Sequence, residues 1–278
     1  ASSRDGLWRR GSLPHGWRRG LWPRAQWRRG RGAGILGAVI ALGVTAASVV
    51  AIVPANTVSA SFSARTVAAA NSWATGVAPV PLGTAAGYAV LAGTLVSNGA
   101  ASRLAGNVGT SPGASITGFP PGQTTGTLQR NTAAATAAQK DLATAYAALA
   151  SRAGTSRAPA LTGTLLAGVH SSSTGAFTVP GVLTLDAKGD PSAVFVFTST
   201  TLATAPSSQV LLVNGAAAKN VFWRVGGTAS LGDSSVFAGS LLGAGNISVE
   251  TNVAVTGRLL TTGGSIVIKH LEQVFPAA

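Results

Sequence analysis

Cysteine is missing from this chain of 278 residues. Disulfides, zinc–thiolate sites, iron–sulfur clusters and thiol nucleophiles are therefore excluded. Charged residues are also scarce, at 10% of the chain, and aromatic residues make up only 6%. With 46% hydrophobic residues and 36 glycines, the composition favours a folded main body, because disordered chains are rich in charge and poor in aliphatic side chains.

Most of the positive charge lies at the start of the chain. Residues 1–31 hold nine arginines against the single acid Asp5, within a formal net charge of +13. A Trp-Arg-Arg-Gly unit recurs at residues 8–11, 17–20 and 27–30 without apolar periodicity, which indicates a basic, disordered tail. Tryptophan and arginine can bind single-stranded nucleic acid. An apolar segment follows directly, however, so we expect a targeting sequence and no nucleic-acid partner.

The apolar segment extends from Ala33 to Val53 without a charge, and the small residues Val58 and Ala60 follow it. A basic region, an apolar run and an A-x-A-like site together predict a secretory signal over residues 32–60 and a secreted, extracellular protein. The run is also long enough to span a bilayer. An uncleaved anchor at the outer cell surface is the alternative, and the chain would then contact a membrane only through this segment. Residues 61–79 look like a linker.

From residue 80 onward, short β patterns alternate with Gly, Asn and Ser-Pro turns. Apolar residues alternate with small polar ones, and equivalent units recur about every 17–19 residues, as in a coil of three short strands and three turns. A β-sandwich is the rival, but it would favour longer strands and hairpin dipeptides. The expected strands are residues 88–96, 104–108, 182–185, 193–198, 209–213, 220–225, 236–238, 247–250, 253–256, 258–260 and 265–268.

One segment has a helical pattern. It begins near Asn131 or Thr132, either of which can be the N-cap, is rich in alanine, and ends before Gly154. Spacings of three and four residues predict an apolar stripe along this helix of about 20 residues. The stripe consists of Ala135, Ala138, Leu142, Ala145 and Leu149.

Catalytic patterns are weak. Polysaccharide-cleaving chemistry needs clustered carboxylates or calcium held by several acids. The closest acidic pair after residue 60, Asp186 and Asp190, stands in a turn sequence, and we expect it to form that turn. His170 and His270 have no partner at metal-ligand spacing, so we expect both on the surface. We therefore expect no enzyme, no metal and no cofactor.

Several long motifs resemble the ice-binding proteins of bacteria, fungi and algae. They include LGTAAGYAVLAG (82–93), GNVGTSPGASITGFPPG (106–122), FTVPGVLTL (177–185), GDPSAVFVF (189–197), NGAAAKNVFWRVG (214–226) and VTGRLLTTGGSIVI (255–268). The resemblance implies a mainly β fold, a right-handed discontinuous β-solenoid (β-helix) with one long α-helix packed alongside. We expect this domain over residues 80–272, followed by a C-terminal tail over 273–278.

The resemblance also implies the function and the partner. We expect a monomer that adsorbs to an ice crystal surface through a flat face and inhibits ice growth or recrystallisation. With Phe237, Val253 and Val255 facing inward, the implied ice-binding residues are Thr94, Ser208, Ser234, Val236, Ala238, Asn252, Ala254 and Thr256. The alternative function is a cell-surface adhesin or interaction module on the same solenoid, with weak or no affinity for ice.

Overall fold

The computed structural model describes residues 77–275. The expected basic tail (1–31), the signal or anchor (32–60) and most of the linker (61–79) lie outside these described residues. Within residues 77–275, no helix is long and apolar enough to cross a membrane.

The strands stack in parallel into a β-solenoid with three faces, named a, b and c. In spatial order, face a contains β8 (Thr155–Arg157), β10 (Gly168–Ser172), β13 (Phe195–Ser199), β16 (Val221–Val225), the second halves of β18 (Val236–Gly243) and β20 (Val253–Thr261), β1 (Tyr88–Ala92), β4 (Asn107–Thr110) and β7 (Leu128–Arg130). Face b is a separate seven-stranded sheet of β11 (Ala176–Val179), β14 (Thr201–Thr204), β17 (Ala229–Leu231), β19 (Ile247–Val249), β21 (Ile266–Ile268), β2 (Leu95–Asn98) and β5 (Ser115–Thr117). Face c contains β9 (Gly163–Leu166), β12 (Val182–Asp186), β15 (Gln209–Val213), the first halves of β18 and β20, β22 (Leu271–Phe275), β3 (Arg103–Leu104) and β6 (Gln123–Thr124).

The β18 and β20 strands belong to two faces because each bends at a glycine. Gly239 has φ 112° and Gly257 has φ 157°, which favour glycine over residues with a side chain. A Cβ atom on Gly257 would lie 1.8 Å from the carbonyl oxygen of Gly239. The two glycines therefore let the strands pass from face c to face a at close contact.

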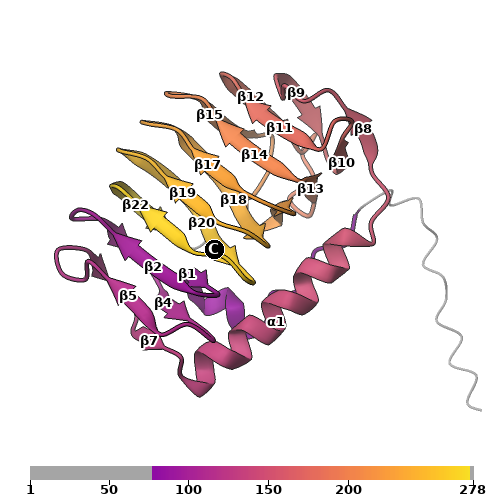
Figure 1. Cartoon of the computed structure of the whole chain (residues 1–278). Coiled ribbons are helices and arrows are strands. Elements are labelled where there is room, and N and C mark those ends of the chain that lie inside the picture. The colour runs from indigo at the N-terminus through magenta and orange to yellow at the C-terminus, as the bar shows by residue number, and fades with distance from the viewer. Residues whose placement is uncertain (1–76, 276–278) are drawn as a thin grey trace, which may run out of the picture. The chain divides into compact units, whose positions relative to one another are not determined.

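The stacking order differs from the chain order, as Figure 1 shows. The early strands β1, β2 and β3 pair with the late strands β20, β21 and β22. After β7, helix α1 (Ala133–Ala150) carries the chain along face a to the other end of the stack, where β8 begins. Two short 3-10 helices, η1 (Gly83–Gly87) and η2 (Ala218–Asn220), complete the fold. The discontinuous β-solenoid with one helix is thus confirmed.

Helix α1 begins and packs as its sequence predicts. The hydroxyl of Thr132 accepts a hydrogen bond from the backbone N–H of Ala135 at 3.2 Å, which satisfies one free donor of the first turn. All members of the predicted stripe are buried: Ala135, Ala138, Leu142, Ala145 and Leu149. They pack against the outward side chains of face a, including Leu91, Val196, Phe222, Leu242 and Leu260.

Inside the solenoid, aromatic side chains stack from coil to coil. The ring centroids of Phe197 and Trp223 are 4.0 Å apart, and those of Trp223 and Phe237 are 5.2 Å apart. The indole N–H of Trp223 donates to the carbonyl oxygen of Ala238 at 2.9 Å, so its one polar group is satisfied in the core.

Some predicted strand boundaries are wrong. The run 88–96 is broken at a corner into β1 and β2, and the runs 253–256 and 258–260 form one strand, β20. Strand β22 continues to Phe275, beyond the expected domain end at residue 272. The β-sandwich alternative is wrong because the ladders are parallel, whereas sandwich sheets are antiparallel.

Candidate functional site

Outward side chains of face b, one from each strand, line up across the sheet. The strand register pairs Ser230 with Ser248, and Ser248 with Val267. Continued in both directions, this column defines the face b ladder, which consists of Thr178, Ala203, Ser230, Ser248, Val267, Ser97 and Thr117. Every member is small or β-branched.

Buried neighbours hold the ladder in place. On β19, Ile247 and Val249 point into the core on either side of Ser248, and on β21 Ile266 and Ile268 do so on either side of Val267. Because side chains alternate along a strand, two buried neighbours force the residue between them outward. The ladder is therefore fixed by the packing of the core beneath it.

Face b carries no charge on any of its strands. The corner toward face a is built on stacked glycines. A Cβ on Gly245 would lie 2.5 Å from the carbonyl oxygen of Gly227, and one on Gly264 would lie 2.1 Å from that of Gly245. At these glycine positions, the corner toward face a carries neither a side chain nor a charge.

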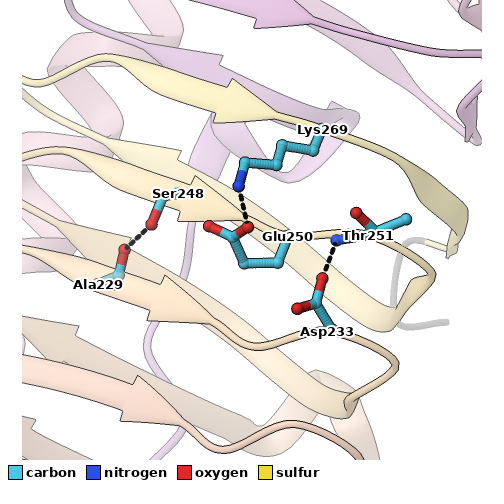
Figure 2. A network of polar contacts seen from close by, with 6 residues as sticks. All are labelled: Ala229, Asp233, Ser248, Glu250, Thr251 and Lys269. Atoms are coloured by element: carbon cyan, nitrogen blue, oxygen red, sulfur yellow. Dashed lines mark hydrogen bonds and ion pairs between the residues drawn. The ribbon is translucent and has the colours of Figure 1, made fainter.

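The corner between faces b and c is charged, as Figure 2 shows beside Ser248. Lys269 and Glu250 form an ion pair, which raises the pKa of Lys269 through the hydrogen bond and charge of the carboxylate. On the neighbouring coil, a carboxylate oxygen of Asp233 accepts a hydrogen bond from the backbone N–H of Thr251 at 2.9 Å. The charges are thus collected at one edge of the ladder.

The residues predicted from the resemblance lie in several places. Val236 and Ala254 are neighbours on face c, and so are Ala238 and Thr256. The inward orientation of Phe237, Val253 and Val255 is confirmed, since all three are at most 1% exposed. Val236 and Thr256 are exposed and Ala254 is half-buried.

Two predicted residues do not reach the surface. Ser208 is 1% exposed, because its neighbour Gln209 aligns with the outward Val236 and alternation turns Ser208 inward. Ala238 is 5% exposed and joins the core where β18 bends at Gly239. The prediction of an outward position is wrong for both.

The remaining predicted residues lie at corners. Ser234 and Asn252 have left-handed backbones, each with φ 57°, in successive turns between faces b and c. Thr94 is exposed in the bend between β1 and β2, at the edge shared by faces a and b. The structure therefore does not unite the predicted set on one surface.

Face c differs from face b in the side chains that it exposes. Among residues 77–275, four of the five exposed large hydrophobic residues lie on face c, and the fifth is Val267 on face b. The four, on adjacent strands, are Leu166, Val182, Leu211 and Val236. Asp186 lies among them on β12, beside Val213 of β15.

The face b ladder was missed although the sequence carries a signal for it. Six of its seven strands share a triplet in which a small or β-branched residue stands between two buried residues, as in Ile247-Ser248-Val249. Aligning the central residues of these triplets would have produced the ladder. The resemblance drew attention to β18 and β20 instead.

The candidate chemical residues take structural positions. Asp186 accepts a hydrogen bond from the backbone N–H of Lys188, and Asp190 accepts one from that of Ser192, both at 2.8 Å. The bond from Lys188 is the main cause that lowers the pKa of Asp186, whereas the hydroxyl of Ser192 lowers the pKa of Asp190 most and the backbone bond adds to this effect. The bonds confirm the predicted turn. His170 is 3% exposed, so its predicted surface position is wrong. Across residues 77–275, no cluster of three His, Asp or Glu side chains could hold a metal ion.

Comparison with known proteins decides the family. The family described as Ice-binding-like matches residues 90–272. The chain belongs to this family.

Relatives from bacteria and fungi align with most of the chain. An ice-binding protein of Nostoc sp. (strain HG1) is 41% identical over 193 residues, which cover 66% of this chain and 70% of that protein. One from Flammulina populicola is 32% identical over 232 residues, covering 74% and 92% of the two chains.

A solved structure of the same family has the same fold. The crystal structure of an ice-binding protein from the Antarctic ascomycete Antarctomyces psychrotrophicus matches with a TM-score of 0.68 and 38% identity. The match covers 72% of this chain and 98% of that one.

Proposed function

We propose that this protein adsorbs to ice through face b and thereby inhibits ice growth or recrystallisation. The observation that carries the choice of face is the face b ladder, an uncharged column of small side chains in register across seven parallel strands. Membership of the Ice-binding-like family supports ice as the partner. The activity is binding, with neither catalysis nor a cofactor.

The geometry suits a crystalline ligand. Parallel strands repeat at about 4.8 Å, so the ladder extends for roughly 29 Å with one side chain at each step. Methyl groups of Thr, Ala and Val can hold a cage of water, and the hydroxyls of Ser and Thr can anchor it. Each contact is weak, but a rigid surface makes many at once, and its preorganisation reduces the entropic cost of binding.

Faces b and c differ in the charged residues that their strands carry. Charged side chains hold hydration water in arrangements that do not match a crystal. Face b has none on its strands, whereas face c includes Asp186 among its outward residues and Arg103 on β3. Face c, with Val236, Ala254 and Thr256, is therefore the second candidate for the ice-binding surface.

A pair of matched substitutions tests the choice of face. Ser248→Tyr places a bulky ring at the middle of the ladder, and Thr256→Tyr places the same ring on face c. Thermal hysteresis and recrystallisation inhibition of the purified protein should be nearly abolished by Ser248→Tyr and retained by Thr256→Tyr, with similar melting temperatures. The reverse result would assign ice binding to face c, and an inactive parent protein would reject ice binding altogether.

The second candidate function is an interaction module or adhesin on the same solenoid. The exposed apolar side chains of face c favour it, because apolar surface patches mark interaction sites. An inactive parent protein in the ice assays would favour this candidate. In either case we propose an extracellular monomer, secreted or held at the outer cell surface by the segment at 32–60.

A further inference from the structure

His170 lies at the end of the solenoid, in the interior. Its imidazole points inward from β10 and stacks on Phe197 of the next coil, with ring centroids 5.1 Å apart. It thus forms the last member of the aromatic stack that continues through Trp223. A histidine, a residue type that ordinarily titrates near neutral pH, is thus buried at the end of the stack of coils.

The hydrogen bonds of His170 fix its protonation state. The Nε of Arg157 lies 3.2 Å from Nδ1 of His170 and always carries a hydrogen, so Nδ1 has to accept. The proton is then on Nε2, which lies 3.0 Å from the carbonyl oxygen of Leu166 and donates to it. The folded protein therefore holds a neutral imidazole with one defined tautomer.

These bonds tie together the last rung, which we define as residues 155–166. Arg157 belongs to β8, the edge strand of face a, and Leu166 belongs to β9, the edge strand of face c. Between them, the backbone N–H of Leu161 donates to the carbonyl oxygen of Thr178 at 2.8 Å, and Ala160 forms a bridge to Thr178 at the end of face b. The imidazole of His170 therefore connects β8 and β9, the two edge strands of the last rung. The same rung also contacts Thr178, the terminal member of the face b ladder.

The surroundings of His170 disfavour its charged form. Burial lowers its pKa most, the charge of Arg157 lowers the pKa further, and the hydrogen bond to Leu166 acts in the opposite direction. The elements packed against it from the other sides offer no compensating acid: β13 contributes Phe197, β11 is uncharged, and Asp186 of β12 points outward on face c.

We propose that protonation of His170 releases the last rung, so that the imidazole acts as a pH-sensitive latch. A proton on Nδ1 would set an N–H donor against the N–H donor of Arg157 and place a buried positive charge beside the half-buried guanidinium. Neither group can turn into an acceptor. Detachment of residues 155–166 lets the imidazolium reach water and separates the two charges.

The direction of the pH effect follows from linkage. The pKa of His170 is lower in the closed rung than in an exposed chain, where it is about 6.5. The stability that the neutral imidazole gives the rung is therefore fully present above pH 6.5 and is lost as the pH falls below that value. At pH 5.0 the open rung should gain up to about 30-fold over its population at pH 7.5.

The latch would also regulate the ice-binding surface, a consequence that rests on the proposed function. Opening removes the backbone partners of Thr178, so that β11, which carries the terminal member of the face b ladder, becomes an unpaired edge. The release itself is measured without ice, so its failure and the failure of the proposed function are separate results.

Amide hydrogen exchange tests the latch directly. The N–H groups of Leu161, Ser173 and Thr178 are hydrogen-bonded across the last rung. After correction for the chemical exchange rate, their opening should be about 10- to 30-fold more frequent at pH 5.0 than at pH 7.5. The N–H groups of Ala229 and Ile247, in the middle of the stack, should show no such change.

Two variants assign the effect to one histidine. The amide of His170→Gln can accept from Arg157 and donate to Leu166 without titrating, so the pH dependence should vanish. His270→Gln, at a surface histidine that contacts Asn252, should retain it. Unchanged exchange in the parent protein, or an unchanged response in His170→Gln, would overturn the latch. If His170→Gln does not fold, an NMR titration of His170 in the parent protein decides, and a pKa of 6.5 or above would overturn it.

Discussion

Faces b and c are two sides of the same solenoid, made by the same coils, and yet they expose different chemistry. Face b shows small, uncharged side chains with Val267 as its one exposed large hydrophobic residue. Face c shows Leu166, Val182, Leu211 and Val236 together with Asp186. The core beneath both faces consists of buried residues, such as Ile247 under face b and Phe237 under face c.

Folding constrains the inward residues of a coil, whereas the outward residues are free to serve a ligand. An outward Leu at 39% exposure, such as Leu211, leaves apolar surface in contact with water, and neighbouring side chains of this kind mark interaction sites. The small outward residues of face b expose less apolar area than the large outward residues of face c, and they form a flatter surface. The substitutions below test whether this difference is functional.

The largest effect should come from a substitution at the glycine corner between faces a and b. In Gly264→Ala, the new Cβ would lie 2.1 Å from the carbonyl oxygen of Gly245, so the backbone of β21 has to move away from β19. We expect a loss of about 1–3 kcal/mol in the free energy of unfolding, measured by urea denaturation, because overpacking forces backbone shifts. Thermal hysteresis should fall as well.

The matched control is Gly181→Ala, which lies at the corner between faces b and c. A Cβ there would meet nothing within 4 Å. Its unfolding free energy should stay within about 0.5 kcal/mol of the parent value. Equal losses in both variants would show that the glycine corner has no special role in face b.

A smaller effect, of opposite sign, should come from Val267, the β-branched member of the ladder that lacks a hydroxyl. Val267→Thr keeps the branched shape at 42% exposure and adds an anchoring group between Ser248 and Ser97. Recrystallisation inhibition should improve, reaching the same endpoint at a lower protein concentration. Val236→Thr makes the same change on face c and should leave the endpoint unchanged; an equal improvement there would contradict the assignment of face b.

The smallest effect should come from the charged corner. Lys269 is exposed, with 62% of its side chain accessible, and its ion pair with Glu250 is screened by water and salt. Lys269→Gln should leave the melting temperature nearly unchanged, and ice activity should be retained because the corner lies outside the ladder. A large loss of activity would extend the ice-binding surface to this corner.

Much of the fold could be predicted from the sequence because its signals are local. The alternation of apolar and small residues specifies strands, the recurrence of short units specifies coils, and the stripe from Ala135 to Leu149 specifies the helix face that packs. The turn at Asp186 was also predictable, since an Asp side chain bonds to a backbone N–H two residues further along.

The candidate site was harder to predict because it depends on register between coils. Ser230 and Ser248 are neighbours on face b although 18 positions separate them, and the ladder continues to Ser97 from the far end of the sequence. Ser208 and His170 were misplaced for the same reason. Whether either residue meets water depends on the coil next to it, which short-range alternation does not identify.

Stacked β coils, one helix with a single apolar side, and membership of a family that points to ice all follow from the local pattern of residues along this chain. The tertiary structure alone decided which outward residues align, because the N-terminal coils pair with the last coils of the chain and helix α1 carries the chain between the two ends. The physical reason is that an inward side chain is specified by its own strand, whereas a flat surface is a property of neighbouring strands held about 4.8 Å apart.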